Sequence, residues 1–215
     1  GVHLYADVEA YVQAIDKNLK DHFPGERFAL TGEFVRQMEV IHLVEWVTTA
    51  GTTSLKQLFE TTRFTTEEEQ DHTIAFKGPE NVVLKFHTAT HSNFGTVLFQ
   101  TSASEGFLEA WGTVTNVPDE AQLFAEKNIA FIPHALREVY TESPVTDLID
   151  VSSIKGIIHS HSKWSDGSNS IEEMARYAQS IGMEYLVISD HSKSAGYANG
   201  LSAERILEQH REIDT

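Results

Sequence analysis

The feature that most constrains the fold is a pair of short apolar runs, residues 154–161 and 184–189, separated by one amphipathic segment. In that segment, residues 168–181, apolar side chains recur at the spacing of one helical face, and serines stand where a helix start needs a cap. The order predicts a strand, a helix and a second strand. In such a unit the two strands are parallel and joined by a right-handed crossover.

Histidine and aspartate residues stand at the predicted carboxyl ends of these two strands. His159 and His161 end the first run, and two residues apart on an extended strand they project to the same side. Asp166 follows on the connecting loop, and Asp190 and His191 end the second run. Parallel strands joined by a helix bring their carboxyl ends to one edge, so we expect these side chains to converge. Nitrogen and oxygen ligands without a thiol suit zinc, manganese or iron.

Each of these residues also has an interpretation without a metal. His159 and His161 could simply end a strand, and the Ser-Asp-Gly run around Asp166 could be a turn before a helix. Four ligand-type residues on one predicted rim favour metal binding. For Asp190 two roles stay open. It could contact the metal directly, or it could orient a histidine or cap a loop without touching the metal.

The net charge limits which partners the chain can attract. The sequence holds 32 acidic and 16 basic residues, a net charge of −16, and most of the excess lies in residues 1–150. A field of this sign repels phosphate backbones, which argues against broad electrostatic binding of nucleic acid. A bound divalent cation reverses the sign locally, so metal-dependent phosphate chemistry is compatible with this composition.

No sequence signal indicates a membrane or export. No apolar run approaches the ~20 residues that a membrane-spanning helix needs, and the first residues lack both a basic segment and an apolar core. The chain has no cysteine, which excludes disulfides and fits a reducing compartment. We therefore expect a cytoplasmic protein with no membrane partner.

Residues 1–150 predict a helix-flanked mixed sheet followed by further helices. Helices are expected over residues 7–23, 53–60 and 105–111 and from Asn93 and Pro118 onward. Strands are expected over residues 27–32, 38–49, 61–65, 73–77 and 81–88. The glutamate run 67–69 is interpreted as a solvated loop, and the irregular acidic stretch 141–150 as a domain boundary.

The histidine and aspartate motifs resemble the first two motifs of the PHP (polymerase and histidinol phosphatase) family of metal-dependent phosphoesterases. The matching runs are His159-Ser160-His161, Ser165-Asp166-Gly167 and Ser189-Asp190-His191-Ser192. Residues 154–214 are most similar to the PHP domain attached to bacterial family X DNA polymerases. The resemblance implies a distorted β/α barrel with manganese or zinc ions and 3′-5′ exonuclease or end-processing activity. It also implies that the metal ligands include His159, His161, Asp166 and His191.

The upstream residues resemble, more weakly, the palm and thumb of family X polymerases. Residues 29–36 are similar to the palm signature, residues 93–102 to the later palm motif, and residues 118–137 to the end of the thumb. The resemblance implies a nucleotidyltransferase-like palm at 1–100, a thumb-like helical segment and linker at 101–150, and the first part of a PHP domain at 151–215. The expected fold class is α/β (α+β), a mixed-sheet palm with a small helical thumb followed by the first β-α-β unit of a β/α barrel.

The palm departs from the family pattern at the residues that its chemistry needs. Nucleotidyl transfer uses carboxylates to hold two Mg²⁺ ions. Where the family has Asp-x-Asp, this chain has Leu43-Val44-Glu45, and Lys85 aligns with the third aspartate. Glu33 replaces the signature serine and Val35 one of two arginines. We therefore predict that the Mg²⁺ site and polymerase activity are lost, and that Glu45 is a solvated or paired strand residue with Lys85 as its candidate partner.

The length of the PHP-like part limits what it can do alone. About 60 residues cannot close a β/α barrel, which needs ~200 or more. The resemblance implies further ligands after Thr215 and a helix-hairpin-helix DNA-binding region before Gly1. We expect a fragment of a longer protein, with weak metal affinity and no nuclease activity of its own; the alternative is a vestigial appendage.

Three functions stay open for the parent protein. The first is a metal-dependent phosphoesterase or 3′-5′ exonuclease that acts on DNA or another phosphoester. The second is a non-catalytic module that binds a protein partner through an inactive nucleotidyltransferase fold. The third is a small-molecule phosphatase of the histidinol-phosphatase type.

Overall fold

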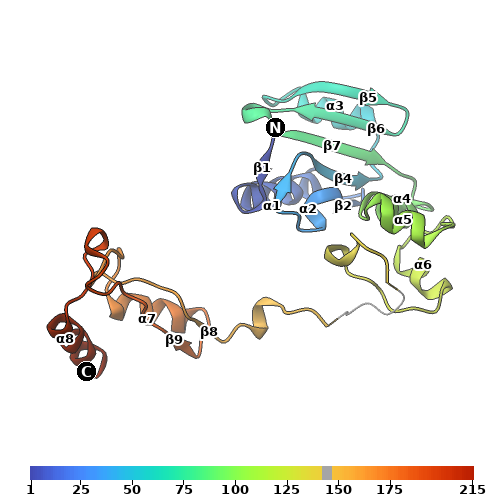
Figure 1. Cartoon of the computed structure of the whole chain (residues 1–215). Coiled ribbons are helices and arrows are strands. Elements are labelled where there is room, and N and C mark those ends of the chain that lie inside the picture. The colour runs from blue at the N-terminus through green and yellow to red at the C-terminus, as the bar shows by residue number, and fades with distance from the viewer. Residues whose placement is uncertain (142–146) are drawn as a thin grey trace. The chain divides into compact units, whose positions relative to one another are not determined.

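The computed structural model describes residues 1–141 and 147–215 and divides into two compact units, Gly1–Thr146 and Asp147–Thr215 (Figure 1). Residues 142–146, inside the acidic stretch expected to be a boundary, lie outside the described residues. In the described parts of the chain, no helix is both long and apolar enough to cross a membrane.

A five-stranded mixed sheet forms the centre of the first unit. Its strand order is β2-β4-β7-β6-β5. The strands are β2 (Phe28–Thr31), β4 (Val44–Thr48), β5 (Thr65–Gln70), β6 (Thr73–Lys77) and β7 (Val83–Thr88). β4 and β7 are parallel and the other pairs are antiparallel, so the predicted mixed sheet is confirmed. Consecutive residues Trp46 and Val47 are both fully buried, which shows that β4 is covered on both faces.

Helices pack against this sheet and complete its core. They are α1 (Tyr5–His22), the one-turn α2 (Gly32–Val35) and α3 (Thr52–Phe59). The predicted helices at 7–23 and 53–60 are thus confirmed within one or two residues. α1 buries Val8, Val12 and Leu19 in the same hydrophobic cluster as Trp46 and Phe86.

The predicted strand 38–49 is broken into two pieces. The first piece, β3 (Val40–Ile41), pairs with β1 (His3–Leu4), whereas β4 joins the central sheet. Between them, both the backbone N–H and the ring of His42 bind the Glu33 carboxylate. The side chain of Glu33 therefore replaces a neighbouring strand as partner for the backbone at this point.

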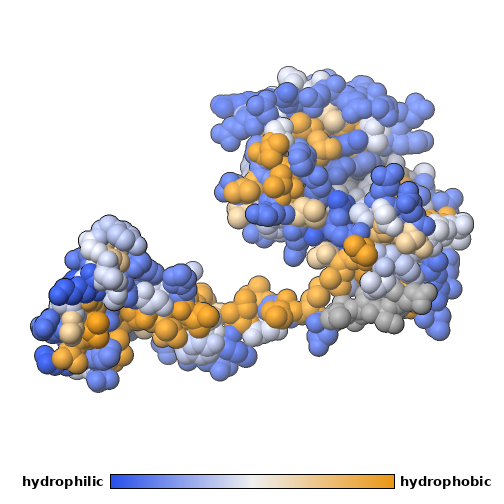
Figure 2. All heavy atoms as spheres, viewed as in Figure 1, coloured by the Kyte–Doolittle hydropathy of each residue, from blue (hydrophilic) through white to orange (hydrophobic). Residues whose placement is uncertain are grey.

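The predicted strand at 61–65 and the predicted loop at 67–69 are both wrong. The strand expected at 61–65 starts only at Thr65, because the hydroxyls of Thr61 and Thr62 donate to carbonyls at the end of α3. Residues 67–69, expected as a loop, lie in the edge strand β5, which is exposed along its whole length. Hydrophilic surface covers this edge in Figure 2. Lys56 of α3 forms an ion pair with Glu69 of this strand.

A second hydrophobic cluster in the first unit gathers α4 (Phe94–Thr101), α5 (Glu105–Trp111) and α6 (Ala121–Glu126). The helix expected from Pro118 begins later, at Ala121, whose N–H bonds the Asp119 carboxylate in a turn. Buried Arg137 donates to the carboxylate of Glu120 at 2.7 Å and to the hydroxyl of Ser102. Arg137 thus ties the residue before α6 to the end of α4 through a buried ion pair and a hydrogen bond.

The second unit contains the predicted β-α-β arrangement. β8 (Gly156–Ile157) and β9 (Tyr185–Leu186) are parallel and α7 (Ile171–Ser180) connects them; α8 (Ala203–Ile213) follows. A capping box starts α7: the hydroxyl of Ser170 accepts a hydrogen bond from the N–H of Glu173, and the carboxylate of Glu173 accepts one from the N–H of Ser170.

The strands of this unit are two residues long, much shorter than the apolar runs that predicted them. Beyond Ile157, hydroxyl groups enter the pairing: Ser160 donates to the carbonyl of Val187 and Ser189 to that of Ile158. Backbone contacts also continue past β9, from the N–H of Val187 to the carbonyl of Ile157 and from the N–H of Ser189 to the carbonyl of Ser160. The predicted ligands after Ile157 therefore lie on a loop and not on a strand.

Candidate metal centre

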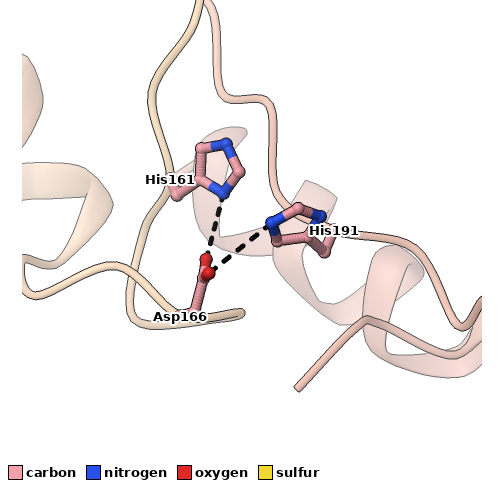
Figure 3. Close-up of side chains that lie close together, drawn as sticks. All are labelled: His161, Asp166 and His191. Carbon is pink, nitrogen blue, oxygen red and sulfur yellow. Dashed lines mark hydrogen bonds and ion pairs between the residues drawn. The ribbon is translucent and has the colours of Figure 1, made fainter. Parts of the chain in front are cut away.

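Three side chains of the second unit converge on one point (Figure 3). His161 comes from the loop after β8, Asp166 from the turn that follows it, and His191 from the loop after β9. One ligand atom of each residue lies within 4.8 Å of the others. Among the described residues, this is the single group of three or more potential ligands that is close enough to hold one ion.

The carboxylate of Asp166 links the two imidazole rings. Its Oδ1 is hydrogen-bonded to Nδ1 of His161 at 3.0 Å, and its Oδ2 lies 3.5 Å from Nε2 of His191. Burial raises the pKa of Asp166, but the hydrogen bonds from His161 and Ser165 and the charge of His191 outweigh it and hold the pKa below its usual value. All three side chains are partly accessible to solvent, so an ion could enter directly.

His159 stays outside this group. It is exposed, and its ring centroid lies 5.4 Å from that of His161. The predicted alternation requires a strand through both histidines, and the regular strand ends at Ile157. The structure therefore brings three of the four predicted ligands together and leaves His159 beside them.

Asp190 faces protein donors instead of the three ligands. Its Oδ1 accepts from the N–H of Ser162 and the hydroxyl of Ser165, both at 2.6 Å. Its Oδ2 accepts from the hydroxyl of Ser162 and from Nε2 of Gln209, both at 2.5 Å. Burial raises the pKa of Asp190, yet these hydrogen bonds lower it below the usual value. Of its two open roles, the contacts favour the one away from the metal, because Asp190 caps the loop that carries His161 and Asp166 and orients the ligands through Ser162 and Ser165.

Two residues that the sequence analysis did not identify also shape this loop. Gln209 reaches Asp190 from α8, and nothing in the local sequence around either residue signals that contact. Gly167 lies so close to the loop that a Cβ there would be 1.9 Å from the carbonyl oxygen of His161. The close approach at Gly167 did have a sequence signal, the glycine of the Ser-Asp-Gly run, because glycine is the residue that fits where backbones approach closely.

The residues predicted to be degenerate palm positions lie in the other unit. Leu43 precedes β4 and is half-buried, while Glu45 on β4 stands opposite Lys85 on the parallel neighbour β7. No ion pair joins Glu45 to Lys85 in the described part of the chain; Oε1 of Glu45 is instead hydrogen-bonded to Nε2 of His87 at 2.9 Å. Gly32, at φ +68°, packs against the same carboxylate, so close that a Cβ would be 2.0 Å from Oε2. The expected partner Lys85 is thus replaced by His87.

Comparison with known proteins gives one informative similarity. The chain is 42% identical over 107 residues to the DNA polymerase/3′-5′ exonuclease PolX of Bacillus subtilis (strain 168). The match covers 48% of this chain but only 19% of PolX, so it spans less than a fifth of that relative's length. No family model matches the chain. The similarity shows a PolX-like relationship, with which the mixed α/β fold is consistent.

Proposed function

We propose that this chain is a piece of a family X polymerase-like protein, and that its second unit supplies part of a PHP-type site that hydrolyses phosphoesters. One observation carries the proposal: His161, Asp166 and His191 converge on loops that follow two parallel strands. The relationship to PolX supports it, because that relative is named as a 3′-5′ exonuclease as well as a polymerase.

The donor set of the cluster fits a divalent metal ion. Two imidazole nitrogens and a carboxylate are ligands that zinc and manganese both accept. His161 and His191 would bind through neutral rings, and Asp166 would contribute negative charge. His159 is the candidate for a further ligand, because it lies next to His161. When bound, the ion would polarise a phosphoryl oxygen and lower the pKa of a coordinated water.

The residues around the cluster hold it in place before any ion arrives. Asp166 bridges the two rings, and Asp190 fixes the backbone and hydroxyls of the loop that presents them. Ligands that need little rearrangement bind at a lower entropic cost. In the parent protein, the substrate would be DNA or another phosphoester.

We also propose that the palm is inactive in nucleotidyl transfer. The one remaining carboxylate, Glu45, is hydrogen-bonded to His87, and Lys85 places a cation directly opposite Glu45 on the neighbouring strand. Two Mg²⁺ ions would have to bind beside that cation with one acid in place of three. In a primer-extension assay with Mg²⁺ we expect no nucleotide addition; addition by the wild type that is lost in Glu45→Gln would overturn this part.

Manganese binding tests the metal centre directly. We expect the chain to bind Mn²⁺, measured by electron paramagnetic resonance, and His161→Ala and His191→Ala to weaken binding by about tenfold or more, since removal of even an outer partner costs 10–100-fold. His210→Ala is the matched control, because His210 is an exposed histidine of the same unit outside the cluster. Equal Mn²⁺ affinity in all four proteins would contradict the proposal.

Hydrolysis assays separate the alternatives. A labelled single strand and a small phosphomonoester are incubated with Mn²⁺ and a longer form of the protein that includes the remaining barrel. Digestion of the strand that is lost in His161→Ala supports the nuclease. Turnover of the phosphomonoester alone supports a small-molecule phosphatase, and no turnover of either supports a non-catalytic module that binds a protein.

A further inference from the structure

Tyr197 is an unusually exposed aromatic residue beside the candidate metal centre. Its side chain is 91% exposed, more than any other large hydrophobic side chain in the described residues. Its ring centroid lies 6.1 Å from that of His191, with the two rings tilted by 58°. The ring therefore contributes little to the core and lies next to His191, a proposed metal ligand.

The turn that carries Tyr197 is firmly held. It is the 3-10 turn η4 (Gly196–Ala198). Ala195, just before this turn, and Ala198, its last residue, are buried. The N–H of Ala195 donates to the carbonyl of Ser192, and the N–H of Leu201 donates to the carbonyl of His191 at 2.7 Å. These contacts close the segment from His191 to Leu201 into a loop, so the position of Tyr197 is tied to that of His191.

The same turn is also fastened to the loop that carries Asp166. Asn199 adopts a left-handed backbone conformation, at φ 52°, and its side-chain amide donates to the carbonyls of Trp164 and Ser165. Asn tolerates this conformation better than most residues. Two segments that present His191 and Asp166 thus share one framework with Tyr197.

A solvent-facing ring on a hydrogen-bonded turn, next to the proposed site for phosphoester chemistry, has a chemical partner in a nucleobase. Base–aromatic stacking is tolerant of sequence, because every base has a π-face. In a closed duplex the base faces are covered by neighbouring pairs, so only an unpaired or terminal base offers a free face. Tyrosine contributes a large contact area with few rotatable bonds, which keeps the entropic cost of stacking low.

We propose that Tyr197 stacks on the base of a nucleotide whose phosphate lies at the His161–Asp166–His191 cluster, and that it thereby selects single-stranded or frayed ends over phosphoesters without an aromatic group. This inference rests on the proposed hydrolytic function. Tyr197 acts here as a substrate-positioning residue, and the chemistry belongs to the metal ligands.

Strand binding by the full chain tests this role without hydrolysis. A short thymidine strand and an abasic strand of equal length, both labelled at the 5′ end, are titrated with protein in Mn²⁺ and followed by fluorescence anisotropy. We expect the wild type and Tyr197→Phe to bind the thymidine strand about tenfold more tightly than the abasic strand, and Tyr197→Leu to lose this preference. Tyr177→Leu, which removes another exposed tyrosine of the same unit, should keep it.

The outcomes distinguish this inference from the proposed function. If the wild type does not discriminate between the strands, or if Tyr197→Leu keeps the preference, stacking by Tyr197 is refuted. Loss of the preference in Tyr197→Phe would refute it too, because it would assign the effect to the hydroxyl. Mn²⁺ binding is measured in parallel: unchanged affinity in Tyr197→Leu shows that the cluster is intact, whereas no Mn²⁺ binding by the wild type contradicts the proposed function and leaves the strand comparison valid.

Discussion

Replacement of Asp190 by asparagine should weaken the metal centre without touching a ligand. The carboxylate of Asp190 accepts four hydrogen bonds, from the N–H and hydroxyl of Ser162, the hydroxyl of Ser165 and the amide of Gln209. Asparagine has nearly the same shape but only one acceptor oxygen. Two of the four donors therefore lose their acceptor.

The magnitude follows from the burial of these donors. Ser162, Ser165 and Gln209 are all buried, so water cannot replace the lost acceptor. A hydrogen bond to a charged group contributes about 1.5–3 kcal/mol. The Ser162 hydroxyl can rotate to accept from the new amide, which recovers one contact, so we expect a local loss of about 2–3 kcal/mol. Because these serines frame the ligand loop, Mn²⁺ affinity should fall about 10–100-fold.

Two measurements on the full chain check this reasoning. Hydrogen–deuterium exchange should speed up in residues 160–168 of Asp190→Asn, and Mn²⁺ titration should show the weaker affinity. Asp166→Asn is the matched control: its side chain is 45% exposed, so it should lose Mn²⁺ affinity with little change in exchange elsewhere. If Asp190→Asn weakened Mn²⁺ binding with unchanged exchange, Asp190 would act as a ligand, and the orienting role would be refuted.

Two further predictions concern Glu120 in the first unit and Gly167 in the second. Burial raises the pKa of Glu120, but hydrogen bonds from His134 and Arg137 and the charge of Arg137 outweigh it and hold the pKa below its usual value. The ionised Glu120 therefore stabilises the fold above the ordinary glutamate range, and this contribution is lost as pH falls through the lowered pKa. Glu120→Gln should lower stability at neutral pH by about 3–5 kcal/mol and flatten that acid dependence in thermal melts; an unchanged acid slope would refute this. Gly167→Ala should displace the carbonyl of His161 at a cost of about 1–3 kcal/mol and weaken Mn²⁺ binding. Gly196→Ala is the control, because a Cβ there meets open space and should leave Mn²⁺ binding unchanged. Equal Mn²⁺ affinities in the two variants would contradict the steric argument.

The parts of the fold that follow from periodicity were predictable. The β-α-β unit follows from one helical stripe between two apolar runs, and its topology places His161, Asp166 and His191 near one another. Strand length was not predictable, because hydroxyl contacts from Ser160 and Ser189 replace regular pairing and leave no periodic signal. That difference of a few residues is why His159 lies outside the cluster.

Contacts between distant residues account for the other differences. Gln209 reaches Asp190 from a helix 19 residues further along the chain, and no local pattern reports such a contact. Lys85 and His87 lie on the same face of β7, so strand alternation alone cannot decide which of them meets Glu45. In the structure it is His87 that is hydrogen-bonded to Glu45.

The glutamates of β5 have a consequence for the behaviour of the chain in solution. An open sheet edge presents unpaired backbone groups that can recruit another chain, and proteins often prevent this with charged side chains. Residues 67–69 place three glutamates along this exposed border. Glu67 pairs with Lys77 and Glu69 with Lys56, so the charge is partly balanced, but two copies that approach border to border still bring like-charged glutamates together. Acid or concentrated salt weakens that repulsion, since 1 M salt shortens the screening length to about 3 Å, and self-association should begin at this strand under such conditions.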